Sequence, residues 1–158
     1  IGDLCQLRMG VRVDREGGVL RDYHTALDVP TSDVKGSDTV LSNRWYLTDA
    51  VFLVGLEGDE RVLGLLAEAL RKPVWPLSLG RKACVPSEPV FLPDGLSALS
   101  LETALSEYPL LVSPTGDRCR MVIEDPNGSQ SRPDQPIAPF SERRFDMRAI
   151  RTEYLVCT

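Results

Sequence analysis

One short segment has the residue types that bind a phosphate. It comprises Ser78, Leu79, Gly80, Arg81 and Lys82, in which a glycine precedes two adjacent cations. A glycine lets backbone amides approach an anion closely, and a guanidinium contacts phosphate through two parallel hydrogen bonds. The alternative is a surface turn with two solvated cations. A Walker loop is excluded because the spacing G-x-x-x-x-G-K-[ST] is absent.

A second segment, residues 43–46, reads Asn-Arg-Trp-Tyr and places a cation beside two aromatic rings. In a strand, Arg44 and Tyr46 point to one face and Trp45 to the other. One interpretation is a platform that contacts phosphate and stacks on bases. The other places Trp45 in the core and pairs Arg44 with an acid such as Asp49. The sequence leaves both open.

The single histidine, His24, lies between Tyr23 and Thr25. General-base catalysis requires a nucleophile or carboxylate within reach, and no pattern here fixes one. We therefore predict no catalytic residue and interpret His24 as structural or hydrogen-bonding. Tyr23 and His24 are also suited to contacting an unpaired RNA base.

Metal and cofactor sites are not indicated. The four cysteines, Cys5, Cys84, Cys119 and Cys157, lie far apart without C-x-x-C spacing, and the carboxylates show no metal-loop pattern. We interpret the cysteines as reduced thiols of a cytoplasmic protein, with long-range disulfides in a secreted protein as the alternative. The longest apolar run near residue 51 is too short to span a bilayer.

The overall charge argues against a nucleic-acid binder, because 23 acidic residues outnumber 18 basic ones. The charge is uneven, however. Residues 61–87 are basic, and a second cluster follows near the end: Arg143, Arg144, Arg148 and Arg151. Such runs indicate either solvated faces or a local anion-binding strip on an acidic body.

Apolar periodicity predicts the elements that position these residues. Strands are expected at 7–13, 118–124 and 151–157, and a buried central strand at 46–56. Helices are expected at 59–72 and 100–108. Two short strands, one around 90–92, should flank the glycine loop. Residues 28–43 and 125–139 are rich in turn residues and predict loops. The order favours an α+β sandwich with helices on one face of an antiparallel sheet.

Three stretches together resemble one family: LRDYHTAL at 20–27, RWYLTDAVFLVGL at 44–56 and ALRKPVWPLSLGRKACVPSEPV at 69–90. In this order they are similar to the CasD family, a RAMP subunit of the type I-E CRISPR surveillance complex, Cascade. The similarity covers roughly residues 4–112 and continues loosely through the tail. It implies a ferredoxin-like domain of the RNA-recognition-motif type, with a long β-hairpin thumb and a smaller C-terminal β-rich part.

The resemblance implies domain boundaries as well. Residues 1–95 would be the remainder of the ferredoxin-like domain, with the thumb at about 20–44, and 96–158 a C-terminal subdomain. The family begins with a strand, a glycine-rich turn and a helix that are not found here. The resemblance therefore implies that about fifty to sixty residues precede Ile1.

The resemblance also implies a function. The family is non-catalytic, holds the 5′ handle of CRISPR RNA, and contacts a backbone subunit and the large PAM-reading subunit in the cytoplasm; target DNA is met only through the complex. The RNA-binding residues would be Arg44 at the end of the thumb, the loop of Ser78, Leu79, Gly80, Arg81 and Lys82, and the thumb base at Tyr23, His24 and Thr25. The alternatives are a metal-independent CRISPR RNA endonuclease using His24, as in a related subtype, and an acidic protein-interaction module.

Overall fold

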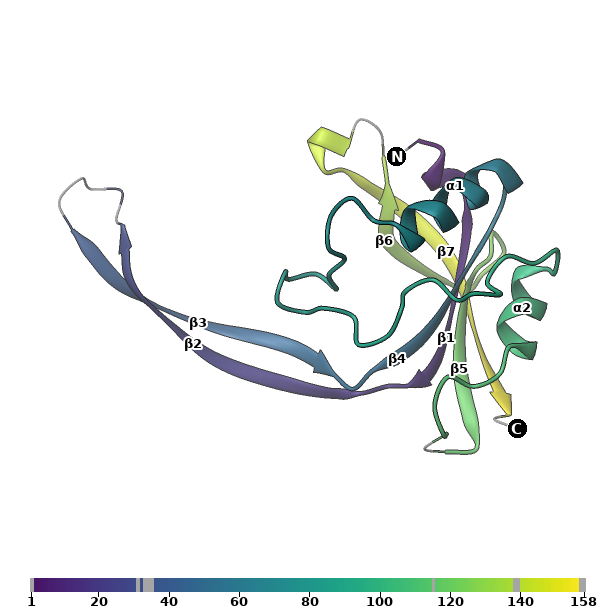
Figure 1. The fold of residues 1–158 in the computed structure, drawn as a ribbon, viewed down its shortest axis with the longest axis horizontal. Helices are drawn as coiled ribbons and strands as arrows, with labels where there is room; N and C mark the ends of the chain where they lie inside the picture. Colours follow the sequence, from purple (N-terminus) through teal and green to yellow (C-terminus); the bar gives the residue numbers. More distant parts are fainter. Residues whose placement is uncertain (1, 31, 33–35, 115, 138–139, 157–158) are drawn as a thin grey trace.

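A five-stranded antiparallel sheet and a long two-stranded ribbon form the architecture (Figure 1). The computed structural model describes residues 2–30, 32, 36–114, 116–137 and 140–156. The elements in chain order are a 3-10 turn at Leu4–Gln6, β1 (Arg8–Arg15), β2 (Gly18–Pro30), β3 (Ser37–Thr48), β4 (Val51–Glu57), α1 (Glu60–Arg71), α2 (Leu101–Glu107), β5 (Arg118–Glu124), β6 (Gln130–Pro136), a 3-10 turn at Phe140–Glu142 and β7 (Phe145–Val156).

The main sheet has the strand order β4-β1-β5-β7-β6, while β2 and β3 pair only with each other. The chain leaves the sheet at the end of β1, runs out and back along the ribbon, and re-enters at β4, which pairs with β1. This is the predicted α+β, ferredoxin-like arrangement with a β-hairpin thumb. The ribbon projects far from the sheet (Figure 1).

Helix α2 covers one face of the main sheet and forms the core with it. Leu101 and Leu105 pack against Leu53, Met121 and Ile123. The helix begins where the Ser100 side chain accepts a hydrogen bond from the Thr103 amide, which satisfies one of the free amides of the first turn. It lies close to the sheet because two glycines, Gly10 and Gly55, face it from β1 and β4.

A buried ion pair fixes the other end of α2. The Arg12 guanidinium donates to the Asp14 carboxylate at 2.7 Å and to the carbonyls of Leu105 and Pro109 at 2.6 and 2.9 Å. Asp14 also accepts from the Leu111 amide at 2.8 Å. Both charged groups are shielded from water and have partners for their charges. Because Arg12 donates to carbonyls at the end of α2, the strand beneath the helix satisfies groups that the helix itself leaves free.

Several predicted elements differ from those observed. The 46–56 segment is divided at Asp49, a residue with positive φ, and its second half, β4, is an edge strand of the described sheet rather than a central one. Residues 72–100 contain no described strand, so the prediction of two short strands flanking the glycine loop, one of them around 90–92, is wrong. Parts of 28–43 and 125–139 are strands β3 and β6, because backbone pairing overrides their turn-rich composition.

Cys119 takes part in a disulfide, whereas Cys5 and Cys84 are free, so the prediction of four reduced thiols is wrong for Cys119. The division at residue 95 stays a prediction, and strands from both sides of it share the main sheet. None of the described helices has the length and apolarity needed to cross a membrane.

Candidate nucleic-acid interface

The ribbon has two faces that the register of its strands defines. Cross-strand partners share a face, and successive residues of one strand alternate between faces. Asp22 pairs with Arg44, His24 with Ser42 and Leu20 with Tyr46. This set is called the arginine face below. On the opposite side, Arg21 pairs with Trp45, Tyr23 with Asn43, Val19 with Leu47 and Thr25 with Leu41; this set is called the tryptophan face.

The predicted thumb-base residues therefore separate. His24 and Arg44 lie on the arginine face and are half-buried, whereas Tyr23 and Thr25 lie on the tryptophan face and are exposed. The interpretation that placed Trp45 in the core is wrong, because its side chain is 63% exposed. The alternation of Arg44 and Trp45 between faces is as predicted.

The glycine loop reaches the arginine face through Arg81. The loop is closed by two backbone bonds, from the Leu79 amide to the Cys84 carbonyl and from the Cys84 amide to the Arg81 carbonyl, each 2.8 Å. Gly80 has a φ of 84°, a conformation that favours glycine. The Arg81 guanidinium lies 5.7 Å from the ring centre of Tyr46, and this cation–π contact joins the loop to the ribbon.

All five loop residues are exposed: Ser78, Leu79, Gly80, Arg81 and Lys82. In the described part of the chain, Arg44, Arg81 and Lys82 have no ion-pair partner, so their charges are available to an external anion. Arg44 faces Asp22 across the ribbon, and Asp22 lies 3.9 Å from Nδ1 of His24. At that distance Asp22 and His24 are an ion pair only when the imidazole is protonated, not a hydrogen-bonded dyad.

The arginines near the C-terminus, unlike Arg44, Arg81 and Lys82, have ion-pair partners within the described chain. Arg144 pairs with Glu142, Arg148 with Asp134, and Arg151 with carboxylates on three sides, namely Glu102, Asp125 and Glu153. The predicted second basic cluster is thus largely neutralised within the molecule, which supports the solvated-face interpretation for it.

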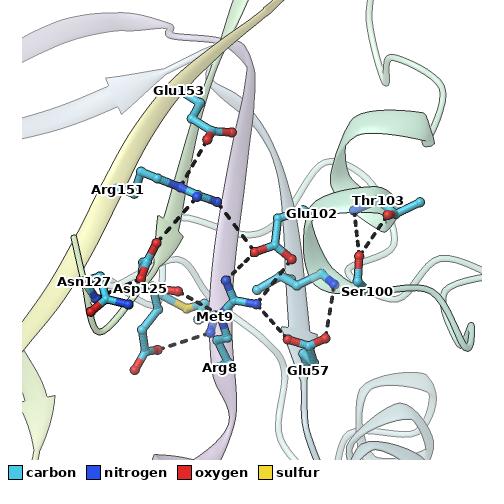
Figure 2. A network of polar contacts seen from close by, with 12 residues as sticks. Arg8, Met9, Glu57, Ser100, Glu102, Thr103, Asp125, Asn127, Arg151 and Glu153 are labelled. Carbon is cyan, nitrogen blue, oxygen red and sulfur yellow. Dashed lines mark hydrogen bonds and ion pairs between the residues drawn. The ribbon is translucent and has the colours of Figure 1, made fainter.

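Figure 2 shows the network to which Arg151 belongs. Arg8 of β1 donates to Glu57 of β4 and to Glu102 of α2, and its guanidinium holds the pKa of Glu102 below the ordinary value. Glu57 also accepts from the Leu101 amide. Each carboxylate here has an arginine or backbone partner, so the cluster fastens α2 to the sheet. Among the described residues no group of His, Cys, Asp and Glu is arranged to hold a metal.

Two residues that make cation–π contacts on the ribbon were not among the predicted site residues. Tyr46 carries the contact with Arg81, and Arg21 lies with its guanidinium 5.7 Å from the ring centre of Trp45. Strand alternation alone assigns Tyr46 to the face of Arg44. The contact with Arg81 depends on how residues 72–100 fold back, and these residues have no periodicity from which to predict it.

Comparison with known proteins defines the class. Residues 3–151 match the model of the family described as CRISPR-associated protein (Cas_Cas5). The chain belongs to the Cas5 family.

Three individual proteins are similar to this chain over part or most of its length. The chain is 37% identical over 78 residues to the CRISPR system Cascade subunit CasD of Escherichia coli (strain K12); the match covers 46% of this chain and 35% of that relative. A structure described as a Cas protein superposes with a TM-score of 0.79 at 43% identity, over 99% of this chain and 70% of the other. A chain of a CRISPR RNA-guided surveillance complex superposes with a TM-score of 0.75 at 30% identity, over 95% of this chain and 68% of the other.

Proposed function

We propose that this chain is a non-catalytic, RNA-binding subunit of a cytoplasmic Cascade complex and that it holds the 5′ handle of CRISPR RNA. In the same proposal it bridges the backbone subunit and the large PAM-reading subunit, and it meets target DNA only through the assembled complex. Membership of the Cas5 family supports the class of complex. The partners and the handle come from the family resemblance.

One observation carries the RNA-binding part of the proposal. Arg44 lies on the arginine face of the ribbon, Arg81 contacts Tyr46 of the same face, and neither forms an ion pair with a described carboxylate. Lys82 follows Arg81 in the chain and is exposed. A phosphodiester backbone is the polyanion that such a row of separated cations fits. The negative net charge does not oppose this, because Debye screening confines the repulsion of distant carboxylates to about 10 Å.

The test uses the full-length protein co-expressed with its complex partners and a CRISPR RNA. An Arg44→Ala/Arg81→Ala/Lys82→Ala variant is compared with wild type by size-exclusion chromatography and by RNA content. We expect loss of RNA and of the assembled peak. The matched control is Arg118→Ala/Arg143→Ala/Arg132→Ala, which removes the same charge elsewhere. Unchanged RNA content in the first variant would favour the acidic interaction module.

The endonuclease alternative has one supporting observation. His24 lies on the arginine face, beside Asp22 and across from Ser42, where a bound RNA strand would pass. In that reaction His24 would take the proton of a 2′-hydroxyl, whose oxygen attacks the adjacent phosphate; a 2′,3′-cyclic phosphate forms, the bond from phosphorus to the 5′-oxygen breaks, and the leaving 5′-oxygen takes a proton from water. Incubation of precursor RNA with wild-type and His24→Ala protein decides the matter: cleavage lost in the variant supports the nuclease, and no cleavage by either supports the binding role.

A further inference from the structure

The segment that follows α1 exposes large apolar side chains that take no part in the core. Val74 is 88%, Trp75 80% and Val85 69% exposed. They belong to residues 73–91, called the proline strap below, which Figure 1 draws as an irregular teal trace after α1. Apolar groups gathered on a surface in this way are unfavourable in water, so they indicate a region that another molecule covers.

The proline strap and the end of α1 border an apolar groove of about 520 Å³. Four prolines line it, together with aliphatic side chains and the ring of Phe91. Trp75 lies in the chain between Pro73 and Pro76, which both line the groove, so this tryptophan stands at its edge. The groove and the exposed side chains therefore form one continuous apolar surface.

The walls of this groove are held in place before anything binds. The Arg71 guanidinium lies 4.4 Å from the ring centre of Phe91, and this contact ties the strap to the end of α1. Each proline fixes one backbone dihedral angle. Two backbone hydrogen bonds of 2.8 Å, from the Leu79 amide to the Cys84 carbonyl and from the Cys84 amide to the Arg81 carbonyl, close the loop within the strap. A groove formed in advance loses little conformational entropy when a partner binds.

The shape and the walls of the groove favour a segment of protein over other ligands. Most of its lining residues are exposed, and a groove this open cannot bury most of the surface of a small molecule. Proline and aliphatic side chains offer no hydrogen bonds to a phosphate or to the edge of a base, which argues against a nucleotide. An apolar stretch of polypeptide lying along the groove needs neither.

The charge around the groove restricts the partner further. Residues 61–91 contain five basic residues and two acidic ones, in a chain whose net charge is −5. Arg71 lines the groove beside Glu88, and Lys72 directly precedes its first proline. Neither Arg71 nor Lys72 has an ion-pair partner in the described part of the chain. Because opposite charges attract and orient partners across an interface, carboxylates on the partner are the complement of these two cations.

We propose that the proline strap and the end of α1 form a docking groove for an apolar, carboxylate-bearing segment of a neighbouring protein subunit, with Trp75 as the anchor at its edge. The inference rests on the proposed function for the presence of such a subunit, and adds where on this chain the contact lies and what chemistry the partner brings. Tryptophan and arginine are the residues that most often dominate the binding energy of a protein interface.

Photocrosslinking identifies what covers the groove. The full-length protein, with p-benzoylphenylalanine in place of Val74, is co-expressed with its complex partners and a CRISPR RNA, irradiated as the purified complex, and mapped by mass spectrometry. We expect crosslinks to one segment of a partner subunit that combines apolar and acidic residues. Crosslinks to RNA, to the protein's own chain, or to no partner would overturn the proposal. The control places the same group at Leu99, which is 52% exposed and outside the groove, and should not give that crosslink.

Substitutions measure the contribution of the groove. Binding of the purified subunit that the crosslink identifies should weaken about 30-fold or more in Trp75→Ala. It should also weaken in Lys72→Glu, most strongly at low salt, and stay unchanged in Leu99→Ala. Thermal unfolding checks that each variant is folded. Unchanged binding in both Trp75→Ala and Lys72→Glu would overturn the proposal, as would loss of RNA with the subunit still bound.

The Arg44→Ala/Arg81→Ala/Lys82→Ala variant separates this inference from the proposed function. If that variant keeps its RNA, the handle proposal fails, whereas the docking groove is judged by binding of the subunit to Trp75→Ala and Lys72→Glu.

Discussion

Arg12 is a buried cation on which the packing of α2 depends. Its guanidinium is buried, pairs with Asp14 and satisfies carbonyls at the end of α2. In Arg12→Ala the Asp14 charge and those carbonyls lose their partner. We expect the free energy of unfolding to fall by about 3–5 kcal/mol, measured by urea denaturation of the full-length protein. Arg118→Ala, on the exposed start of β5, should change it by less than about 0.5 kcal/mol. Equal effects would contradict the role of the pair.

The ion pair of Glu102 predicts how the free energy of unfolding depends on pH. Its hydrogen bonds from Arg8 lower the pKa below the ordinary value of 4.5. A carboxyl whose pKa is lower in the folded state stabilises the fold above its unfolded pKa, and this stability is lost as the pH falls through the folded value. Between pH 5 and pH 3 the unfolding free energy of wild type should therefore fall more steeply than that of Glu102→Gln. Parallel curves would show that the pair contributes nothing.

The close packing of helix α2 against the main sheet depends on two glycines. A Cβ on Gly55 would lie 2.7 Å from Cδ1 of Leu101, and a Cβ on Gly10 would lie 2.6 Å from Cδ1 of Leu105. Both leucines are buried, so they have little room to move. We expect Gly55→Ala to destabilise the protein by about 1–3 kcal/mol.

Gly64 of α1 is the matched control. A Cβ there meets no atom within 4 Å, and alanine favours a helix. Gly64→Ala should stabilise the protein by about 0.5–1 kcal/mol in the same thermal or urea unfolding assay. A destabilised Gly64→Ala variant, or a neutral Gly55→Ala variant, would contradict the described packing.

The two helices could be predicted from the sequence, whereas strand β6 could not. Both helices follow from their caps and apolar spacing, since Asp59 and Ser100 accept the expected amide bonds. Strand β6 contains Pro133 and Pro136 and was predicted as a loop, yet an edge strand tolerates residues that lack an amide proton. The RNA-binding role of the site residues stays a prediction. Arg81 contacts the face of the ribbon that carries Arg44, whereas Tyr23 and Thr25 lie on the other face, which can be assigned only from the register of β2 and β3.

For the whole molecule, the distribution of paired and unpaired cations matters more than the net charge of −5. RNA binding by the full complex should weaken with salt, and each phosphate contact of a single strand contributes about 0.7 to the slope of log affinity against log salt. We expect Arg44→Ala/Arg81→Ala/Lys82→Ala to reduce that slope by up to about 2, measured by filter binding at several salt concentrations. Arg148→Ala removes a neutralised cation and should leave the slope unchanged.

The two strands of the ribbon are continuous in the chain with β1 and β4 of the main sheet, with only short breaks at Glu16–Gly17 and Asp49–Ala50. These breaks lie at one level and are braced by Arg15 Nε on the Asp49 carbonyl at 2.6 Å, Thr48 on the Gly18 carbonyl at 3.1 Å, and the Glu16–Arg120 ion pair at 2.8 Å. A pull on the ribbon draws both of its strands, and therefore β1 and β4, in the same direction, so the load passes from this strand pair to the ladder between β1 and β5. The hairpin is thus anchored in the sheet through both of its strands, and tension in a ligand bound to it is carried through β1 to the body of the protein.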